Sequence, residues 1–156
     1  RSTLARSSAA SDVYKRQMNY LLDTNVVSEL RKPPGKVNPR VFEWVNAQIL
    51  HSQYLSAITI YELKLGISRK NHTDPVQGQR LQKWFTQDLL PLFEGRVLPL
   101  DERVAIEAAN MNVPDPRPQA DLFIAATARV HGLTIVTRSQ KDFEPMGVQY
   151  LNPWEL

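Results

Sequence analysis

Apolar residues along this chain gather in short continuous runs, which alternate with longer stretches where they recur at helical spacing. A short apolar run without polar interruption is typical of a strand buried on both faces of a parallel sheet. Strands are therefore expected at residues 19–23, 53–57, 96–100, 133–137 and 148–151.

The stretches between these runs predict helices, with one further turn after the fourth strand. The helices are expected at residues 24–32, 39–50, 58–70, 71–93, 102–111 and 119–132. Proline and glycine at 33–35 stop the first helix. Pro75 lies near a helix start within the segment 71–93. Asp101 is placed as an N-cap and Gly132 as a C-cap.

Helical spacing also predicts which side chains face the core. These are Val41, Trp44, Val45, Ile49, Ile58, Tyr61, Leu65, Ile67, Leu81, Trp84, Phe85 and Leu89. Phe42 is likewise expected in the core rather than on a docking surface.

Strands that alternate with helices favour an α/β fold with a doubly wound, mainly parallel sheet of about five strands and helices on both faces. No internal repeat or long linker divides residues 18–156, which we expect to form one domain. Residues 1–17 open on Arg1, are rich in Ser and Ala, and lack the apolar core of a signal peptide. We interpret them as a cloning or adaptor-derived segment, with the natural protein beginning at Met18.

Composition narrows the chemistry. The chain has no cysteine, which excludes disulfides, thiol catalysis and cysteine-bound zinc and fits a cytoplasmic location. No apolar stretch approaches the ~20 residues needed to cross a membrane. The 19 basic and 16 acidic side chains give a net charge of +3. Residues 1–17 hold four of the basic and one of the acidic side chains, which leaves 15 of each sign in residues 18–156.

The net charge is therefore no evidence for nucleic-acid binding, and only the local distribution of charge is informative. Two basic clusters could steer a phosphate backbone or could be ordinary solvated faces. They are Arg31, Lys32, Lys36 and Arg40, and Arg69, Lys70, Arg80 and Lys83.

Four acidic residues lie near the ends of predicted strands or at the start of a buried helix. Asp23 closes the first strand, and Glu62 lies one helical turn beyond the second. Asp142 follows the fourth strand, and Asp121 begins the apolar helix that leads into that strand. Ligand sites of open parallel sheets form beyond the carboxyl ends of the strands, so the fold can bring all four acids to one edge.

Each acid also has a purely structural interpretation. Asp23 can cap the next helix, Glu62 and Asp142 can be solvated, and Asp121 can complement a helix dipole. Taken together, however, carboxylates in one dry cleft raise each other's pKa, and a divalent cation removes that penalty. Mg²⁺ suits an acid cluster without His or Cys, and such a site indicates phosphodiester hydrolysis.

Four segments in the same order resemble the PIN-domain ribonucleases, and among them the VapC/FitB type of toxin in bacterial toxin–antitoxin pairs. The segments are "LLDTNVVSEL", "LSAITIYELKLGI", "ADLFIAATARVHGLTIVTRSQKDFEPMGV" and the terminal "NPW". The resemblance extends from Met18 to Trp154 and implies a PIN-domain fold.

By position, Asp23, Glu62 and Asp121 match the three acidic site residues of that family. The resemblance implies that Asp23 and Asp121 bind Mg²⁺, or alternatively Mn²⁺. It also implies that Glu62 completes the site, either through a second ion or by positioning the attacking water. Asp142 is assigned the fourth acidic role.

Four polar residues match supporting positions of the same family. Thr24 and Asn25 match the polar pair after the first acid, and Thr137 matches the hydroxyl that ends the fourth strand. Some relatives carry Asp or Asn where this chain has Ser139. This departure leaves open which residue provides the fourth acidic position.

The resemblance further implies metal-dependent endonucleolytic cleavage of single-stranded RNA that leaves a 5′-phosphate and a 3′-hydroxyl. Its expected partners are an antitoxin protein whose tail blocks the acids and a second copy of the chain, or a larger toxin–antitoxin assembly. Phe42 and Trp44 could contribute to such contacts if they were exposed.

Two alternatives remain at this point. A haloacid-dehalogenase-type phosphohydrolase also places an Asp after its first strand, but it needs a second acid where this chain has Asn25. A non-catalytic RNA-binding or scaffold domain is the other alternative, although retention of the four acids argues against a decayed site.

Overall fold

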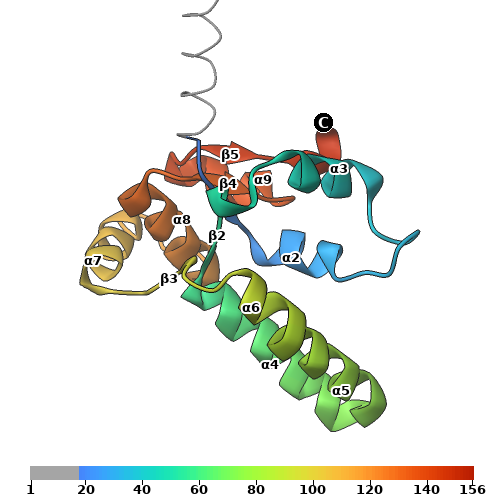
Figure 1. Ribbon diagram of the computed structural model, residues 1–156. Helices are drawn as coiled ribbons and strands as arrows, with labels where there is room; N and C mark the ends of the chain where they lie inside the picture. The colour runs from blue at the N-terminus through green and yellow to red at the C-terminus, as the bar shows by residue number, and fades with distance from the viewer. Residues whose placement is uncertain (1–17) are drawn as a thin grey trace, which may run out of the picture.

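The structure is a computed structural model, and it describes residues 18–156 (Figure 1). The segment 1–17 lies outside the described residues. Its interpretation as non-native, and the assignment of residues 18–156 to one domain, stay predictions.

Five parallel strands form one sheet in the order β3-β2-β1-β4-β5. The strands are β1 (Tyr20–Leu22), β2 (Gln53–Ser56), β3 (Val97–Leu98), β4 (Thr134–Val136) and β5 (Tyr150–Leu151). The central strand β1 pairs with both β2 and β4, and Leu22 lies opposite Val136. The predicted α/β fold with a parallel sheet is confirmed.

Within residues 18–156, six helices contain seven or more residues. They are α2 (Thr24–Leu30), α3 (Pro39–Ala47), α4 (Ala57–Thr73), α5 (Pro75–Trp84), α7 (Glu102–Met111) and α8 (Gln119–His131). The shorter elements are η1 (Leu50–Ser52), the π-helical η2 (Phe85–Leu89), α6 (Leu90–Leu92), α9 (Gln140–Phe143), η3 (Glu144–Met146) and η4 (Pro153–Glu155).

Side chains of β1 alternate between two core layers, as expected for a strand covered on both faces. Tyr20 and Leu22 pack in a layer with residues of α2, α3 and α4. Leu21 packs on the opposite face with residues of α7, α8 and α9. The helices therefore cover both faces of the sheet, and the residues that follow β1 and β4 lie together at one edge.

Helices α4 and α5 form a hairpin that extends away from the sheet (Figure 1). Gly78 of α5 lies against Asn71 of α4, and a Cβ atom at position 78 would be 2.3 Å from the Cα of Asn71. The hairpin can close this tightly only because residue 78 has no side chain.

The predicted helix caps are confirmed. Asp101 accepts a hydrogen bond from the backbone N–H of Val104 at 3.1 Å and caps α7. Gly132 ends α8 with a φ of +66°, the left-handed conformation that favours glycine.

The predictions of buried side chains are wrong at Phe42, Ile49 and Tyr61, which are 51%, 55% and 60% exposed. Helix α3 ends at Ala47, so Ile49 lies beyond it. Helix α4 buries a face with Thr59, Leu63 and Ile67 at spacings of four residues, which turns Tyr61 outward.

Trp44 does lie against the core, as predicted. Its ring meets that of Tyr20 edge to face, with centroids 4.9 Å apart. None of the helices within residues 18–156 has the length and apolar composition needed to span a membrane.

Candidate functional site

Asp23 lies where the central strand β1 ends, and its side chain is only 5% exposed. Oδ1 accepts a hydrogen bond from the backbone N–H of Thr24 at 2.7 Å, and Oδ2 accepts one from the hydroxyl of Thr137 at 2.7 Å. Burial raises the pKa of Asp23 against the opposing effect of these two hydrogen bonds, and the charges of Glu62 and Asp142 raise it further. Asp23 is thus both the N-cap of α2 and a buried acid.

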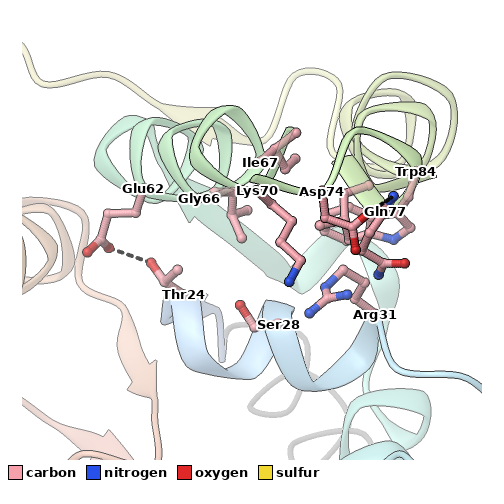
Figure 2. A pocket seen from close by; sticks show the side chains of 12 residues that line it. Thr24, Ser28, Arg31, Glu62, Gly66, Ile67, Lys70, Asp74, Gln77 and Trp84 are labelled. Atoms are coloured by element: carbon pink, nitrogen blue, oxygen red, sulfur yellow. Dashed lines mark hydrogen bonds between the residues drawn. The ribbon is translucent and has the colours of Figure 1, made fainter. Parts of the chain in front are cut away.

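Glu62 reaches the same region from α4. The hydroxyl of Thr24 donates a hydrogen bond to Glu62 Oε1 at 2.6 Å (Figure 2). The same hydroxyl lies 3.1 Å from the hydroxyl of Thr59. Thr24 therefore joins the first turn of α2 to α4 and holds the carboxylate of Glu62 near enough to Asp23 for the two to interact electrostatically.

Asp121 lies in the first turn of α8. Its pKa is raised to about 6, first because the carboxyl group is partly withdrawn from water and then because Asp23, Asp142 and Glu62 repel its charged form. Asp121 is therefore close enough to all three other predicted acids to interact with them electrostatically.

The polar residues around these acids form one hydrogen-bonded network. Asn25 Nδ2 donates to the hydroxyl of Ser139 at 3.1 Å, and Asn25 Oδ1 accepts from the backbone N–H of Arg138 at 3.3 Å. The backbone N–H of Ser139 in turn donates to the hydroxyl of Thr137 at 2.9 Å. This network connects the start of α2 to the end of β4.

One cavity of about 460 Å³ gathers most of the predicted site residues, and we call it the acidic cavity. Its lining includes Asp23, Thr24, Asn25, Glu62, Asp121 and Ser139. Asp142 is exposed on α9 and is not part of the lining, although its charge raises the pKa of Asp23 and Asp121. Its assignment as the fourth acid stays a prediction, as do the roles of the other site residues.

Glu29 is a lining residue that the sequence interpretation missed. It is 6% exposed and accepts hydrogen bonds from Lys32 Nζ at 2.9 Å and from the backbone N–H of Asn38 at 2.8 Å. Burial alone would raise the pKa of Glu29, but these bonds and nearby positive charge outweigh it and lower the pKa. Its position three residues after Val26, on the buried face of the predicted helix, was the available signal.

The oxygen atoms of the acidic cavity suit a hard divalent cation. Carboxylates and hydroxyls are the ligands such ions prefer, and the lining has no histidine. Within residues 18–156, no three acidic or histidine side chains are gathered tightly enough to form a ready-made metal site. Hydrogen bonds instead direct Asp23 toward Thr137 and Glu62 toward Thr24.

Burial first, and then the charges of the neighbouring acids, raise the pKa values of Asp23 and Asp121, and a bound cation would stabilise the charged form of both carboxyl groups. Fold and site together define a parallel α/β domain with an acidic, oxygen-lined cavity at the carboxyl ends of β1 and β4. Of the predicted residues that surround this cavity, Asp23, Glu62 and Asp121 come from three separate parts of the chain.

The sequence model of the PIN domain family matches residues 20–147, and the chain belongs to this family. It is 42% identical over 145 residues to Toxin FitB of Neisseria gonorrhoeae, an alignment that covers 86% of this chain and 97% of the relative. It is 37% identical over 142 residues to the VapC ribonuclease Y4jK of Sinorhizobium fredii, with coverage of 86% and 97%. The predicted resemblance is confirmed.

Solved structures agree with this assignment. The crystal structure of FitAcB from Neisseria gonorrhoeae aligns with a TM-score of 0.80 at 41% identity and covers 88% of this chain and 99% of that chain. The structure of FitAB bound to the IR36 DNA fragment aligns with a TM-score of 0.75 at 38% identity, covering 88% and 96%. PIN-domain nucleases generally use divalent metal ions, in agreement with the oxygen lining of the acidic cavity.

Proposed function

We propose that this chain is a Mg²⁺-dependent endoribonuclease, specific for single-stranded RNA, and the toxin of a VapBC-like toxin–antitoxin pair. The observation that carries the proposal is the gathering of Asp23, Glu62 and Asp121 around one cavity of a PIN domain. Relatives that match most of the chain carry the names Toxin FitB and VapC ribonuclease. The proposal includes a cytoplasmic location, an antitoxin protein as partner and a homodimer.

Asp23 and Asp121 would hold the cation, with Mn²⁺ as an alternative to Mg²⁺. When bound, the cation would offset the carboxylate charge and assist hydrolysis of a phosphodiester bond electrostatically. Asp142 contributes negative charge from outside the cavity lining.

The remaining residues orient these acids. The backbone N–H of Thr24 and the hydroxyl of Thr137 each hold one oxygen of Asp23, and the hydroxyl of Thr24 holds Glu62 Oε1. Glu62 Oε2 has no hydrogen-bond partner within residues 18–156. We assign it as the acceptor of the proton that the attacking water loses. The water oxygen forms the new bond to phosphorus as the bond to the 3′-oxygen breaks, and that oxygen takes up a proton from solvent to leave as a 3′-hydroxyl.

The test is cleavage of a labelled panel of single-stranded RNAs by the full chain with Mg²⁺, with Mn²⁺ and with EDTA. Asp23→Asn and Asp121→Asn each remove one charge from the acidic cavity, and Asp88→Asn, exposed on η2 and outside the cavity, is the matched control. We expect EDTA to stop cleavage and each cavity variant to reduce kcat/KM by roughly 100-fold, since a lost metal ligand removes several kcal/mol of transition-state stabilisation. Asp88→Asn should cleave like the parent.

Cleavage that survives EDTA or either cavity substitution would overturn the proposed site. Intact RNA across the whole panel, combined with tight RNA binding and no Mg²⁺ binding by calorimetry, would instead support the non-catalytic scaffold alternative.

A further inference from the structure

A second cavity adjoins the acidic cavity, between α2 and the α4–α5 hairpin (Figure 2). Its volume of about 600 Å³ lies within the range of about 300–1,000 Å³ that is usual for small-molecule pockets. Thr24, Ser28, Arg31 and Glu62 line both cavities, so the two adjoin one another. We call this second cavity the hairpin groove.

Two basic side chains extend into the hairpin groove from opposite walls. Arg31 comes from the C-terminal end of α2 and Lys70 from α4 (Figure 2). In the described part of the chain, neither side chain forms a salt bridge or a hydrogen bond. Unpaired cations held in a cavity are available for charge-assisted hydrogen bonds to phosphate oxygens.

Other basic residues of the predicted clusters are engaged differently. Lys32 pairs with Glu29 at 2.9 Å, and Arg40 donates to the backbone oxygen of Trp154 at 3.2 Å. Arg80 and Lys83 are exposed on α5 and line neither cavity. The structure therefore distinguishes Arg31 and Lys70 from these four basic side chains.

Two acids also line the hairpin groove, and both have other contacts. Glu62 stands at the border with the acidic cavity, where it accepts from Thr24. Asp74 accepts from the backbone N–H of Gln77 at 3.3 Å and caps α5, where the positive end of the helix dipole offsets its charge.

The wall of the hairpin groove that α4 provides is open at Gly66. A Cβ atom at this position would meet no atom within 4 Å, so packing does not require glycine there. Glycine within a helix costs about 1 kcal/mol relative to alanine, yet it keeps the groove wide. Leu81 and Trp84 add an apolar wall, a kind of surface on which nucleobases pack in single-strand binding sites.

We infer that the hairpin groove binds the RNA strand next to the cleaved bond, with Arg31 and Lys70 on neighbouring backbone phosphates. The inference rests on the proposed function. A strand whose scissile phosphate lies in the acidic cavity must continue along an adjoining surface, and the hairpin groove supplies two free cations and an apolar wall there. An acidic segment of a protein partner is the competing occupant.

The experiment measures binding of a short fluorescein-labelled single-stranded RNA to the full chain by anisotropy, in EDTA and over a range of salt concentrations. The test variant carries Arg31→Gln with Lys70→Gln, and the matched control carries Arg80→Gln with Lys83→Gln, which removes the same charge from outside the groove. We expect the test variant to bind roughly tenfold or more weakly. Its plot of log K against log salt should be shallower by about 1.4, because each phosphate contact on a single strand contributes about 0.7.

A second pair of variants tests the shape of the groove without a change in charge. Gly66→Leu places a side chain into the hairpin groove, whereas Ser68→Leu adds the same side chain on α4 outside it. Gly66→Leu should weaken RNA binding with an unchanged salt slope, and Ser68→Leu should bind like the parent. In cleavage assays the Arg31 and Lys70 double variant should raise KM more than it lowers kcat.

The inference would be overturned if both double variants weakened RNA binding equally or if neither weakened it. A parent protein that binds no RNA would also overturn it. It would also be overturned if Arg31 and Lys70 governed binding of a glutamate-rich peptide while RNA binding stayed unchanged. RNA that binds through the groove but is never cut with Mg²⁺ or Mn²⁺ would overturn the proposed function and leave the groove assignment standing. RNA cleavage insensitive to Arg31 and Lys70 would overturn the groove assignment alone.

Discussion

Asp121 lies in the first turn of α8, ahead of a run of buried apolar residues, and interacts with the charges of three other acids. Its pKa of about 6, against an ordinary value of 3.8, means that the fold favours the protonated form. The folded state consequently binds more protons than the unfolded state between pH 4 and pH 6. The protonated Asp121 carboxyl therefore contributes its full stabilisation of the folded state at pH values below its ordinary pKa. This stabilisation is lost as pH rises through about 6.

Because the charged carboxylate of Asp121 lowers the stability of the fold at high pH, Asp121→Asn should change stability in a pH-dependent way. In the absence of divalent cations, the variant should be more stable than the parent above pH 6, and the two should converge near pH 4. Partial exposure limits the gain to the order of 1 kcal/mol, or roughly 2–4 °C in Tm for a domain of this size. Calorimetric melting in EDTA between pH 4 and pH 8 measures the difference.

Asp88→Asn, which removes an exposed charge, is the control for this experiment and should follow the parent at every pH. If Tm depended on pH in the same way for Asp121→Asn and the parent, the acidic cavity would not raise the pKa of Asp121. A stabilised variant that no longer cleaves RNA would instead mark Asp121 as a residue kept for function at a cost in stability.

At the scale of secondary-structure elements, the α4–α5 hairpin forms one wall of the proposed groove, and its two glycines have opposite roles. Gly78 is buried where the helices meet, and a Cβ there would lie 2.3 Å from the backbone of Asn71. Gly66 faces open space. The same substitution at these two positions should therefore have opposite effects on the free energy of unfolding.

We predict that Gly78→Ala destabilises the chain by about 1–3 kcal/mol, because the helices must separate to admit the methyl group. Gly66→Ala should stabilise it by up to about 1 kcal/mol through helix propensity. Urea unfolding of both variants and the parent gives the two changes in free energy. Loss of stability in Gly66→Ala, or an unchanged Gly78→Ala, would contradict this account of the hairpin.

The sequence predicted the strands and most helices because uninterrupted apolar runs and helical stripes depend on local chemistry. The sequence alone did not show which face is buried when a helix carries apolar residues on more than one face. Segment 58–70 carries apolar residues on more than one face, and packing against the sheet selects Leu63 and Ile67 rather than Tyr61. Ile49 was misplaced for a related reason, since the end of α3 at Ala47 is only weakly marked in the sequence.

At the scale of the whole molecule, the order of elements explains why the acids of the cavity could be predicted. Parallel strands bring their carboxyl ends to one edge, and because β1 pairs with β4, Asp23 after β1 meets Thr137 after β4. The hairpin groove could not be predicted in this way. It depends on how the α4–α5 hairpin lies beside α2, which the sequence alone does not specify.

The whole chain should respond to Mg²⁺ as one cooperative unit, because the acids of the proposed site come from elements that meet only in the folded state. A ligand that binds the folded state alone stabilises it by about 2.7 kcal/mol at 100 times its Kd, which corresponds to roughly 5–10 °C in Tm. We expect the Tm of the full chain at pH 7.5 to rise with Mg²⁺ concentration and to return to its starting value with EDTA. Asp121→Asn should lose most of this rise and Asp88→Asn should keep it. An equal rise in all three proteins would mean that Mg²⁺ acts on the surface at large rather than at the acidic cavity, and the metal assignment would then be wrong.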